Sequence, residues 1–399
     1  MLIIPLMTSG WLIVGAFIYL LIPGYNYPAG LLIAGCVTAT DPILAQCVVT
    51  GKFAARVPAR LKDLLVCESG VNDGMAFPFV YLSLYLLIYA GQAGKIIKDW
   101  LCVTILYEVI LGSFIGICIG YFGRSCLKIC FKNAFLQTAD YISMCGFPIM
   151  LGVFCAGIGS VLGVDDLLVS FFAGCSFSWD GWYMKQVEIE HGVKSNLVPV
   201  LDLIMNMLYF IYYATTIPWA AFNDHNPIDV WRLILIGIVV IFLRRIPLVL
   251  LLSYVIPDIK NIKEALFVGH FGPIGVSGIF AAIVSKSELE KILFSQEKDF
   301  PMSQLLLSSA NVDTGKYGHE RNKLVMDTIW PIVCFIILVS MLVHGGSIPV
   351  IMLYKYAFCT EKTDDALSES NDALSESNDA LSESNVTYSV VDNNGIKNC

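Results

Sequence analysis

Long apolar stretches dominate the chain and leave few folds open to it. A helix that crosses the hydrocarbon of a membrane needs about 20 mainly apolar residues, and it satisfies its own backbone hydrogen bonds there. The chain is 56% hydrophobic and 15% charged, with a mean hydropathy of +0.70, whereas a soluble chain carries about 25% charged residues. We therefore predict an all-α polytopic membrane protein with about ten transmembrane helices, near residues 2–23, 29–49, 64–90, 101–123, 140–162, 166–179, 197–221, 230–256, 262–285 and 326–353.

Lysine and arginine are unevenly distributed among the loops. They follow the second, fourth, sixth, eighth and tenth stretches, whereas the loops at 25–27 and 222–225 contain none, and Lys95 and Lys98 are exceptions. Positive charge near the ends of spans marks the cytoplasmic side. We expect both termini of this integral membrane protein to be cytoplasmic, which agrees with an even number of spans.

The last residues differ from the rest in composition. From Glu361 onward there are nine acidic residues and two lysines, a net charge of −7 out of −8 for the chain, and the sequence Asp-Ala-Leu-Ser-Glu-Ser-Asn occurs three times in tandem at 365–385. Such a polar acidic segment cannot bury enough apolar surface to fold. We predict a transmembrane domain over 1–357 and a disordered cytoplasmic tail over 358–399. A near-neutral membrane domain and an acidic tail exclude a nucleic-acid-binding protein.

The third apolar stretch contains Glu68, Ser69, Asn72 and Asp73 with no basic residue between them. A charged side chain near the middle of a bilayer costs roughly 2.5–3.5 kcal/mol on insertion scales. Two acids, an amide and a hydroxyl at that depth are typical of a site for a small cation or a proton, and they indicate a transport protein.

Two other stretches are interrupted. Thr38-Ala-Thr-Asp-Pro42 places a proline and an acid in the second, and Gly269-His-Phe-Gly-Pro-Ile-Gly-Val-Ser-Gly278 is too rich in glycine for a straight helix. Paired broken helices mark midplane sites in transporters, although glycine and proline also serve close helix packing and kinks. Because Asp41 lies inside the first break, we favour the functional interpretation.

These segments resemble a known family. Thr38-Ala-Thr-Asp-Pro-Ile-Leu-Ala-Gln46 and Cys67-Glu-Ser-Gly-Val-Asn-Asp-Gly-Met-Ala-Phe-Pro-Phe79 are similar to motifs of monovalent cation–proton antiporters, above all the fungal plasma-membrane Na⁺/H⁺ antiporters. The segments 163–174, 178–182 and 269–280 resemble the same branch. The similarity extends from residue 1 to about residue 355.

The resemblance implies an inverted-repeat fold with two broken crossing helices and a core that moves against a dimerising scaffold. It implies exchange of Na⁺ or Li⁺, and K⁺ as a further candidate, for H⁺ across the plasma membrane in salt tolerance, by a homodimer without a cofactor. Asp73 matches the family's ion- and proton-binding aspartate, where the cation binds transiently. The matching surroundings are Asn72, Glu68, Ser69, Thr40 and Asp41. Family members have about three further spans before the point where this sequence starts, so we expect an N-terminally truncated fold.

The chemistry of these residues agrees with the resemblance. Hard cations take oxygen ligands, which carboxylates, hydroxyls and the freed carbonyls of broken helices supply. A buried carboxylate oxygen holds either a proton or a metal ion but not both, and such competition is sufficient for exchange. Glu68 and Asp73 are five positions apart on a helix, so their side chains diverge by roughly 140°. We expect Glu68 to pair with Arg245 instead, as the resemblance implies; alternatively, Arg244 and Arg245 extend to the membrane interface.

Three further candidates have a structural alternative. Asp165 and Asp166 begin a predicted helix, where acids commonly cap the N-terminus, and they could instead attract cations. His270 lies beside the second break, where it either packs or senses pH. Two other functions remain open: a passive cation channel, and a transport-dead truncated paralogue that regulates a full-length antiporter.

Overall fold

The computed structural model describes residues 3–41, 57–132, 141–183, 185–186, 197–223, 227–299, 316–347, 349–350 and 353. Its contacts divide the chain into Met1–Gly345 and Gly346–Cys399, and the account below concerns the first unit. The whole of the expected tail, 358–399, lies outside the described residues, so its disorder and its boundary after residue 357 stay predictions.

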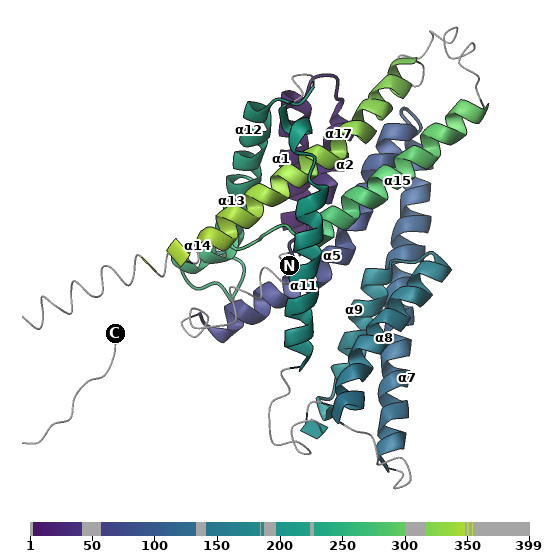
Figure 1. The fold of residues 1–399 in the computed structure, drawn as a ribbon, viewed down its shortest axis with the longest axis vertical. Helices are drawn as coiled ribbons and strands as arrows, with labels where there is room; N and C mark the ends of the chain where they lie inside the picture. The colour runs from purple at the N-terminus through teal and green to yellow at the C-terminus, as the bar shows by residue number, and fades with distance from the viewer. Residues whose placement is uncertain are drawn as a thin grey trace, which may run out of the picture. The chain divides into compact units, whose positions relative to one another are not determined.

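Helices make up nearly all of the described part, which contains no β-strand. Figure 1 shows their course. They are α1 (Ile3–Leu21), α2 (Tyr27–Cys36), α5 (Ala59–Ile88), α6 (Ala93–Asp99), the π-helix η1 (Trp100–Leu111), α7 (Gly112–Lys132), α8 (Tyr141–Leu162), α9 (Asp166–Ser178), α11 (Leu197–Thr216), the 3₁₀-helix η2 (Trp219–Asn223), α12 (Val230–Phe242), α13 (Ile246–Leu252), α14 (Ile262–His270), α15 (Val276–Asp299), α17 (Lys316–Ser340) and the π-helix η3 (Met341–Gly345).

Five helical segments of the described part are long and apolar enough to cross a membrane, judged by length and composition. They are Ile4–Leu21, Ala59–Ile88, Ala93–Phe131, Val230–Leu252 and Gly318–Gly345, and three shorter apolar helices accompany them, Tyr27–Cys36, Gly146–Leu162 and Asp166–Ser178. The all-α membrane architecture is thus confirmed, whereas the number of ten spans stays a prediction.

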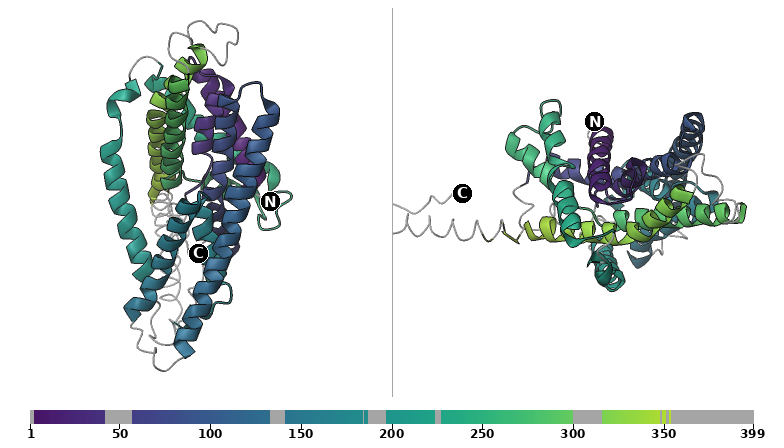
Figure 2. Two further views of the ribbon diagram at one scale, coloured as in Figure 1. Left: turned by 90° about the vertical axis from the view of Figure 1, so that its right-hand side faces the viewer. Right: turned by 90° about the horizontal axis from the view of Figure 1, so that it is seen from above.

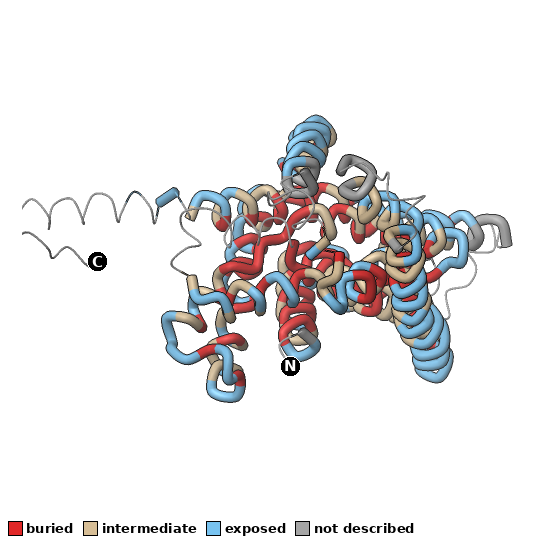
Figure 3. The backbone as a smooth tube through the Cα atoms, turned by 90° about the horizontal axis from the view of Figure 1, so that it is seen from below, coloured by how far each residue is buried: buried red, intermediate tan, exposed pale blue. Residues whose placement is uncertain are grey.

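One apolar core joins helices that are distant in the sequence. Buried side chains of α1, α2, α5, α12, α15 and α17 form a single cluster. Trp11 of α1 connects two neighbours, because its indole N–H donates to the carbonyl of Leu31 at 2.9 Å and to the hydroxyl of Ser83 at 3.2 Å. In Figure 3 the buried residues gather where these helices face one another.

A second group of helices, α7, α8 and α9, packs beside α5 (Figures 1 and 2). Glycine allows α7 and α9 to approach closely: a Cβ on Gly116 would lie 2.4 Å from the carbonyl oxygen of Val169, and one on Gly120 would lie 2.1 Å from that of Ala173. Small residues spaced by four are typical of such membrane helix contacts. Large apolar side chains point outward from this group, as a surface facing lipid requires, among them Phe114, Phe122, Val153, Phe154 and Val161.

The two interrupted stretches meet each other. Helix α2 ends at Cys36, and the chain continues without helix to Asp41; residues 42–49 of the predicted span lie outside the described part. The chain is likewise non-helical between α14 and α15, at residues 271–275. The backbone N–H of Asp41 donates to the carbonyl of Pro273 at 2.8 Å. The hydroxyl of Ser340 in α17 holds the second break, since it accepts from the Ile274 N–H at 2.8 Å.

Four predicted stretches differ from the observed helices. The tenth begins earlier than expected, because α17 starts at Lys316 and not near residue 326. The ninth resumes as α15 and continues to Asp299 instead of ending at residue 285, because its later polar residues form an exposed helix face. The fourth is part of a longer helical run over Ala93–Phe131. The eighth is interrupted between Phe242 and Ile246, where Pro247 near the start of α13 has no backbone N–H to continue the ladder of α12.

Candidate ion-binding site

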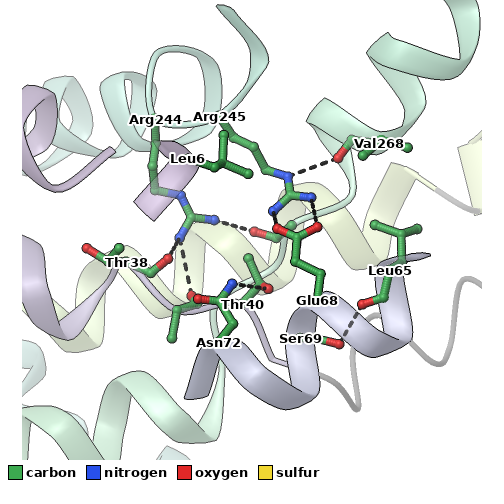
Figure 4. Close-up of polar contacts among 12 residues, drawn as sticks. Leu6, Thr38, Thr40, Leu65, Glu68, Ser69, Asn72, Arg244, Arg245 and Val268 are labelled. Carbon is green, nitrogen blue, oxygen red and sulfur yellow. Dashed lines mark hydrogen bonds and ion pairs between the residues drawn. The ribbon is translucent and has the colours of Figure 1, made fainter. Parts of the chain in front are cut away.

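The two acids of the polar motif on α5 have different environments. Glu68 is 4% exposed and forms a two-pronged ion pair with Arg245, whose Nη1 and Nη2 lie 2.6 and 2.7 Å from the two carboxylate oxygens. The Nε–H of Arg245 donates to the carbonyl of Val268 at 2.9 Å. Figure 4 shows the guanidinium and the carboxylate edge to edge. The charge of Glu68 is therefore neutralised inside the protein.

Arg244, the residue before, donates to backbone carbonyls in the part of the chain that the structure describes (Figure 4). Its guanidinium donates to the carbonyls of Val37 at 2.5 Å and Ala39 at 3.3 Å in the first break, and to that of Gly272 in the second. These carbonyls follow the C-terminal ends of α2 and α14, where the helix dipole is negative. Arg244 is 5% and Arg245 4% exposed, so neither extends to the membrane interface.

Thr40 and Asp41 lie at the first break, next to the motif. The amide Nδ2 of Asn72 donates to the hydroxyl of Thr40 at 3.0 Å, which links α5 to the break. The carboxylate of Asp41 accepts from the backbone N–H of Val276 at 2.8 Å, at the N-terminus of α15. Asp41 is 1% exposed. It thus serves as the cap of α15, where a negative charge complements the dipole.

The environment of the Asp73 carboxylate differs from that of the Glu68 carboxylate. Its Oδ1 is buried without a hydrogen-bond partner in the described part of the chain, and so are Oδ1 of Asn72 and the hydroxyl of Ser277. The carboxylates of Asp41 and Asp165 repel that of Asp73, and the hydroxyl of Ser277 is its polar neighbour. No lysine or arginine forms an ion pair with Asp73 within the described ranges.

The remaining predicted residues have local roles. The hydroxyl of Ser69 donates to the carbonyl of Leu65 in its own helix at 2.8 Å. Asp165 caps α9, since its Oδ1 accepts from the Leu168 N–H at 3.0 Å, and Asp166 is the first residue of that helix. His270 is half-buried, and its ring centroid lies 5.2 Å from that of His344.

The chain is similar to known proteins over most of its length. Residues 1–354 match the family model described as sodium/hydrogen exchanger, transmembrane. The chain belongs to the sodium/hydrogen exchanger family. This exchanger-family chain is 51% identical to Na(+)/H(+) antiporter 2 of Zygosaccharomyces rouxii over 89% of its own length and 42% of the relative's. It is 50% identical to the Na(+)/H(+) antiporter of Saccharomyces cerevisiae over 89% and 34%, and 38% identical to that of Schizosaccharomyces pombe over 88% and 70%.

The fold of the family is also found by structural comparison. The sodium proton antiporter MjNhaP1 from Methanocaldococcus jannaschii matches 86% of this chain and 78% of its own with a TM-score of 0.56, at 16% sequence identity. At this identity the match shows the fold alone. The exchanger-family chain spans less than half the length of the Zygosaccharomyces and Saccharomyces relatives, so the activity of the whole protein is a matter for proposal.

Sequence reasoning missed two residues of this region. Arg244 has the same signal as Arg245, a basic residue in an apolar stretch, but its partners are backbone carbonyls that carry no sequence signature. Ser277 lies inside the quoted glycine-rich segment and looks like a packing residue there.

Proposed function

We propose that this chain forms the transmembrane part of a secondary antiporter that exchanges Na⁺ or Li⁺ for H⁺ by competitive binding at Asp73. The observation that carries the proposal is the buried carboxylate oxygen of Asp73, which has no hydrogen-bond partner and no counter-cation within the described residues. A buried anion is costly unless it is neutralised, and here a proton or a bound cation is what neutralises it.

The contrast with Glu68 supports this role. Both acids lie on α5, but Arg245 neutralises Glu68 permanently, so that Glu68 needs no ion from solution. Asp73 keeps a free oxygen beside the hydroxyl of Ser277 and near the two helix breaks. Carboxylate, hydroxyl and backbone oxygens are the donor set that a hard monovalent cation prefers, and half-helix ends supply such groups in transporters.

Exchange follows if Asp73 binds either a proton or a cation, but not both at once. A proton on Asp73 removes the negative charge that attracts the cation, and a bound cation displaces the proton, so each gradient drives the other ion. The names of the fungal relatives support Na⁺ and H⁺ as the exchanged ions. Further parts of the proposal rest on the resemblance. They are transport of K⁺, a plasma-membrane location, cytoplasmic termini, a homodimer and a role in salt tolerance.

The test is Na⁺-driven proton movement in proteoliposomes that contain the full chain. Asp73→Asn keeps the size of the side chain but cannot release a proton or carry the charge, so we expect exchange to be abolished. Asp63→Asn is the matched control, because Asp63 lies on the same helix with an exposed side chain, and we expect it to retain exchange. Exchange by Asp73→Asn would overturn the assignment. A cation current that does not respond to pH would identify a passive channel instead.

A further inference from the structure

A cavity of about 470 Å³ lies between α11, α15 and α17, the helices that Figure 1 labels. Its lining includes neither the acids of α5 nor the two arginines that follow α12. One wall is aromatic and consists of three tyrosines of α11 and Trp330 of α17, and the other wall is one face of α15. Cavities of roughly 300–1,000 Å³ bind small organic molecules in proteins, so this one has room for more than a bare ion.

Hydrogen bonds fix the aromatic wall. The hydroxyl of Tyr213 donates to the carbonyl of Cys334 at 3.1 Å, and the indole N–H of Trp330 donates to the carbonyl of Thr216 at 3.3 Å. Tyrosine and tryptophan gather at membrane interfaces, where their polar ends meet the headgroups. Tyr213 is instead 3% exposed and bound between α11 and α17. The cavity is therefore built into the packing of these helices.

The face of α15 that lines the cavity changes in character along the helix. Ile279, Ile283, Lys286 and Glu290 follow one another at spacings of three and four residues, so they lie on the same side of the helix. The order along this face is apolar, apolar, positive and negative. Lys286 and Glu290 are exposed, and neither belongs to an ion pair within the described ranges.

Two helices give the depth of the cavity in the membrane. At 1.5 Å per residue, Lys286 lies about 15 Å and Glu290 about 21 Å along α15 from its start at the second break. On α17, Trp330 lies about 15 Å from Ser340, whose hydroxyl binds Ile274 in the same break. Such breaks lie near the middle of the bilayer, and half of the hydrocarbon is about 15 Å thick. The charged part of the cavity therefore lies at the level of the headgroups, and its isoleucines lie at the level of the acyl chains.

We propose that this cavity binds a phospholipid with a zwitterionic headgroup, whose phosphate binds Lys286 and whose ammonium binds Glu290. Such a lipid presents acyl carbons, then a phosphate, then an ammonium, from the middle of the bilayer outward. The face of α15 presents apolar side chains, a cation and an anion in the same order. Residues four apart on a helix have Cβ atoms about 5–6 Å apart, a spacing that one headgroup bridges.

Other occupants fit the cavity less well. An anionic phospholipid matches Lys286, but the carboxylate of Glu290 repels it. A hydrated cation meets walls that are mainly aromatic and aliphatic, and the ammonium of Lys286 repels it. The lipid site is separate from the proposed ion exchange at Asp73, and neither depends on the other.

The first experiment measures lipid binding to the detergent-solubilised full chain by native mass spectrometry. Phosphatidylethanolamine, phosphatidylcholine and phosphatidylglycerol with identical acyl chains are added separately. At least one of the two zwitterionic lipids is expected to bind about tenfold more tightly than phosphatidylglycerol, which has no ammonium for Glu290. The tighter of the two identifies the preferred ammonium group. Equal or tighter binding of phosphatidylglycerol would overturn the proposal.

The decisive variant exchanges the two charges, Lys286→Glu together with Glu290→Lys. It keeps the composition and net charge of α15 but reverses the order of the charges, so we expect the preference for zwitterionic lipid to be lost. Lys291→Gln is the matched control, because Lys291 binds Glu288 on the same helix and does not line the cavity. We expect the control to keep the preference. A charge-exchanged variant that also keeps it would contradict the assignment.

The second experiment uses the unaltered chain and locates the lipid. Zwitterionic phospholipids with a photoreactive diazirine near the start of one acyl chain are crosslinked, and the sites are mapped by peptide mass spectrometry. We expect labelling within 209–216 and 279–283, suppressed by excess zwitterionic lipid but not by phosphatidylglycerol. Labelling spread evenly over the exposed apolar side chains of α7 and α8 would show a general lipid coat only and overturn the site. Displacement by Na⁺ but not by choline would identify a cation entrance instead.

Discussion

At the scale of residues, the same helix contains one acid with a partner and one without. Arg245 binds both oxygens of Glu68, whereas a buried oxygen of Asp73 lacks any partner among the described residues. Burial of a charged pair yields little net stability, but removal of one member leaves an uncompensated charge. Glu68 therefore contributes to the architecture, and Asp73 is the acid that we propose binds the ion.

Glu68→Gln is expected to lower the free energy of unfolding by about 3–5 kcal/mol, because the Arg245 guanidinium stays buried without its counter-charge. The double variant Glu68→Gln, Arg245→Met is expected to recover most of this loss, since it buries no charge. Thermal unfolding of the detergent-solubilised chain measures both. A double variant less stable than the single one would show that the arginine contributes mainly through its bond to the carbonyl of Val268.

The sequence predicted the Glu68–Arg245 pair through the family resemblance, and the structure contains it, but the other contacts around the two acids of α5 were not predictable. Glu68 and Asp73 are recognisable because a motif places them in an apolar stretch. Arg244 and Ser277 depend on tertiary contacts: one binds carbonyls of two distant segments, and the other becomes a neighbour of Asp73 only when α15 packs on α5. Backbone carbonyls are present at every residue, so the sequence does not indicate which of them a side chain will bind.

At the scale of elements, the contact between the two breaks determines the local backbone. Glycine at 275 is required by close approach, because a Cβ there would lie 1.8 Å from Oδ2 of Asp41, the oxygen that accepts from the Val276 N–H. The sequence predicted this break from its glycines. It did not predict the interruption between α12 and α13, because a single proline near the end of an apolar stretch is equally compatible with a kinked helix.

Gly275→Ala is expected to displace Asp41 and to leave the Val276 N–H without its acceptor, at a cost of about 1–3 kcal/mol for overpacking alone. Gly157→Ala is the control, because a Cβ there meets nothing within 4 Å, and alanine in a helix is favoured by roughly 0.5–1 kcal/mol. The midpoint of thermal unfolding should fall for the first and stay or rise for the second. Equal midpoints would show that the Asp41 contact tolerates displacement.

At the scale of the whole molecule, composition alone gave the fold class, and the family model extends over residues 1–354. The acidic segment with its tandem repeats and low hydrophobicity begins after that point. The existence of a span is easier to predict than its ends. An apolar stretch in lipid satisfies its backbone hydrogen bonds by forming a helix, whatever its neighbours are. The ends of a span depend on loops and on packing partners, and α15 is longer than expected for this reason.

Deletion of residues 358–399 is expected to leave the midpoint of thermal unfolding unchanged, because an acidic segment that buries little apolar surface contributes little to a membrane domain. The same variant should retain Na⁺/H⁺ exchange in proteoliposomes if the unaltered chain shows it. The measurement is unfolding of the two chains side by side in one detergent. A lower midpoint for the shortened chain would show that the tail packs on the membrane domain.

Arg244 also limits how the site can move. Its one guanidinium binds carbonyls after α2 and after α14, so a displacement of either half-helix alone would separate this cation from acceptors that water does not replace. The two breaks are therefore connected through one side chain, and moving one of them would require moving the other. If the proposed exchange alternates access to Asp73, we expect the two breaks to move together, because one buried guanidinium binds both of them.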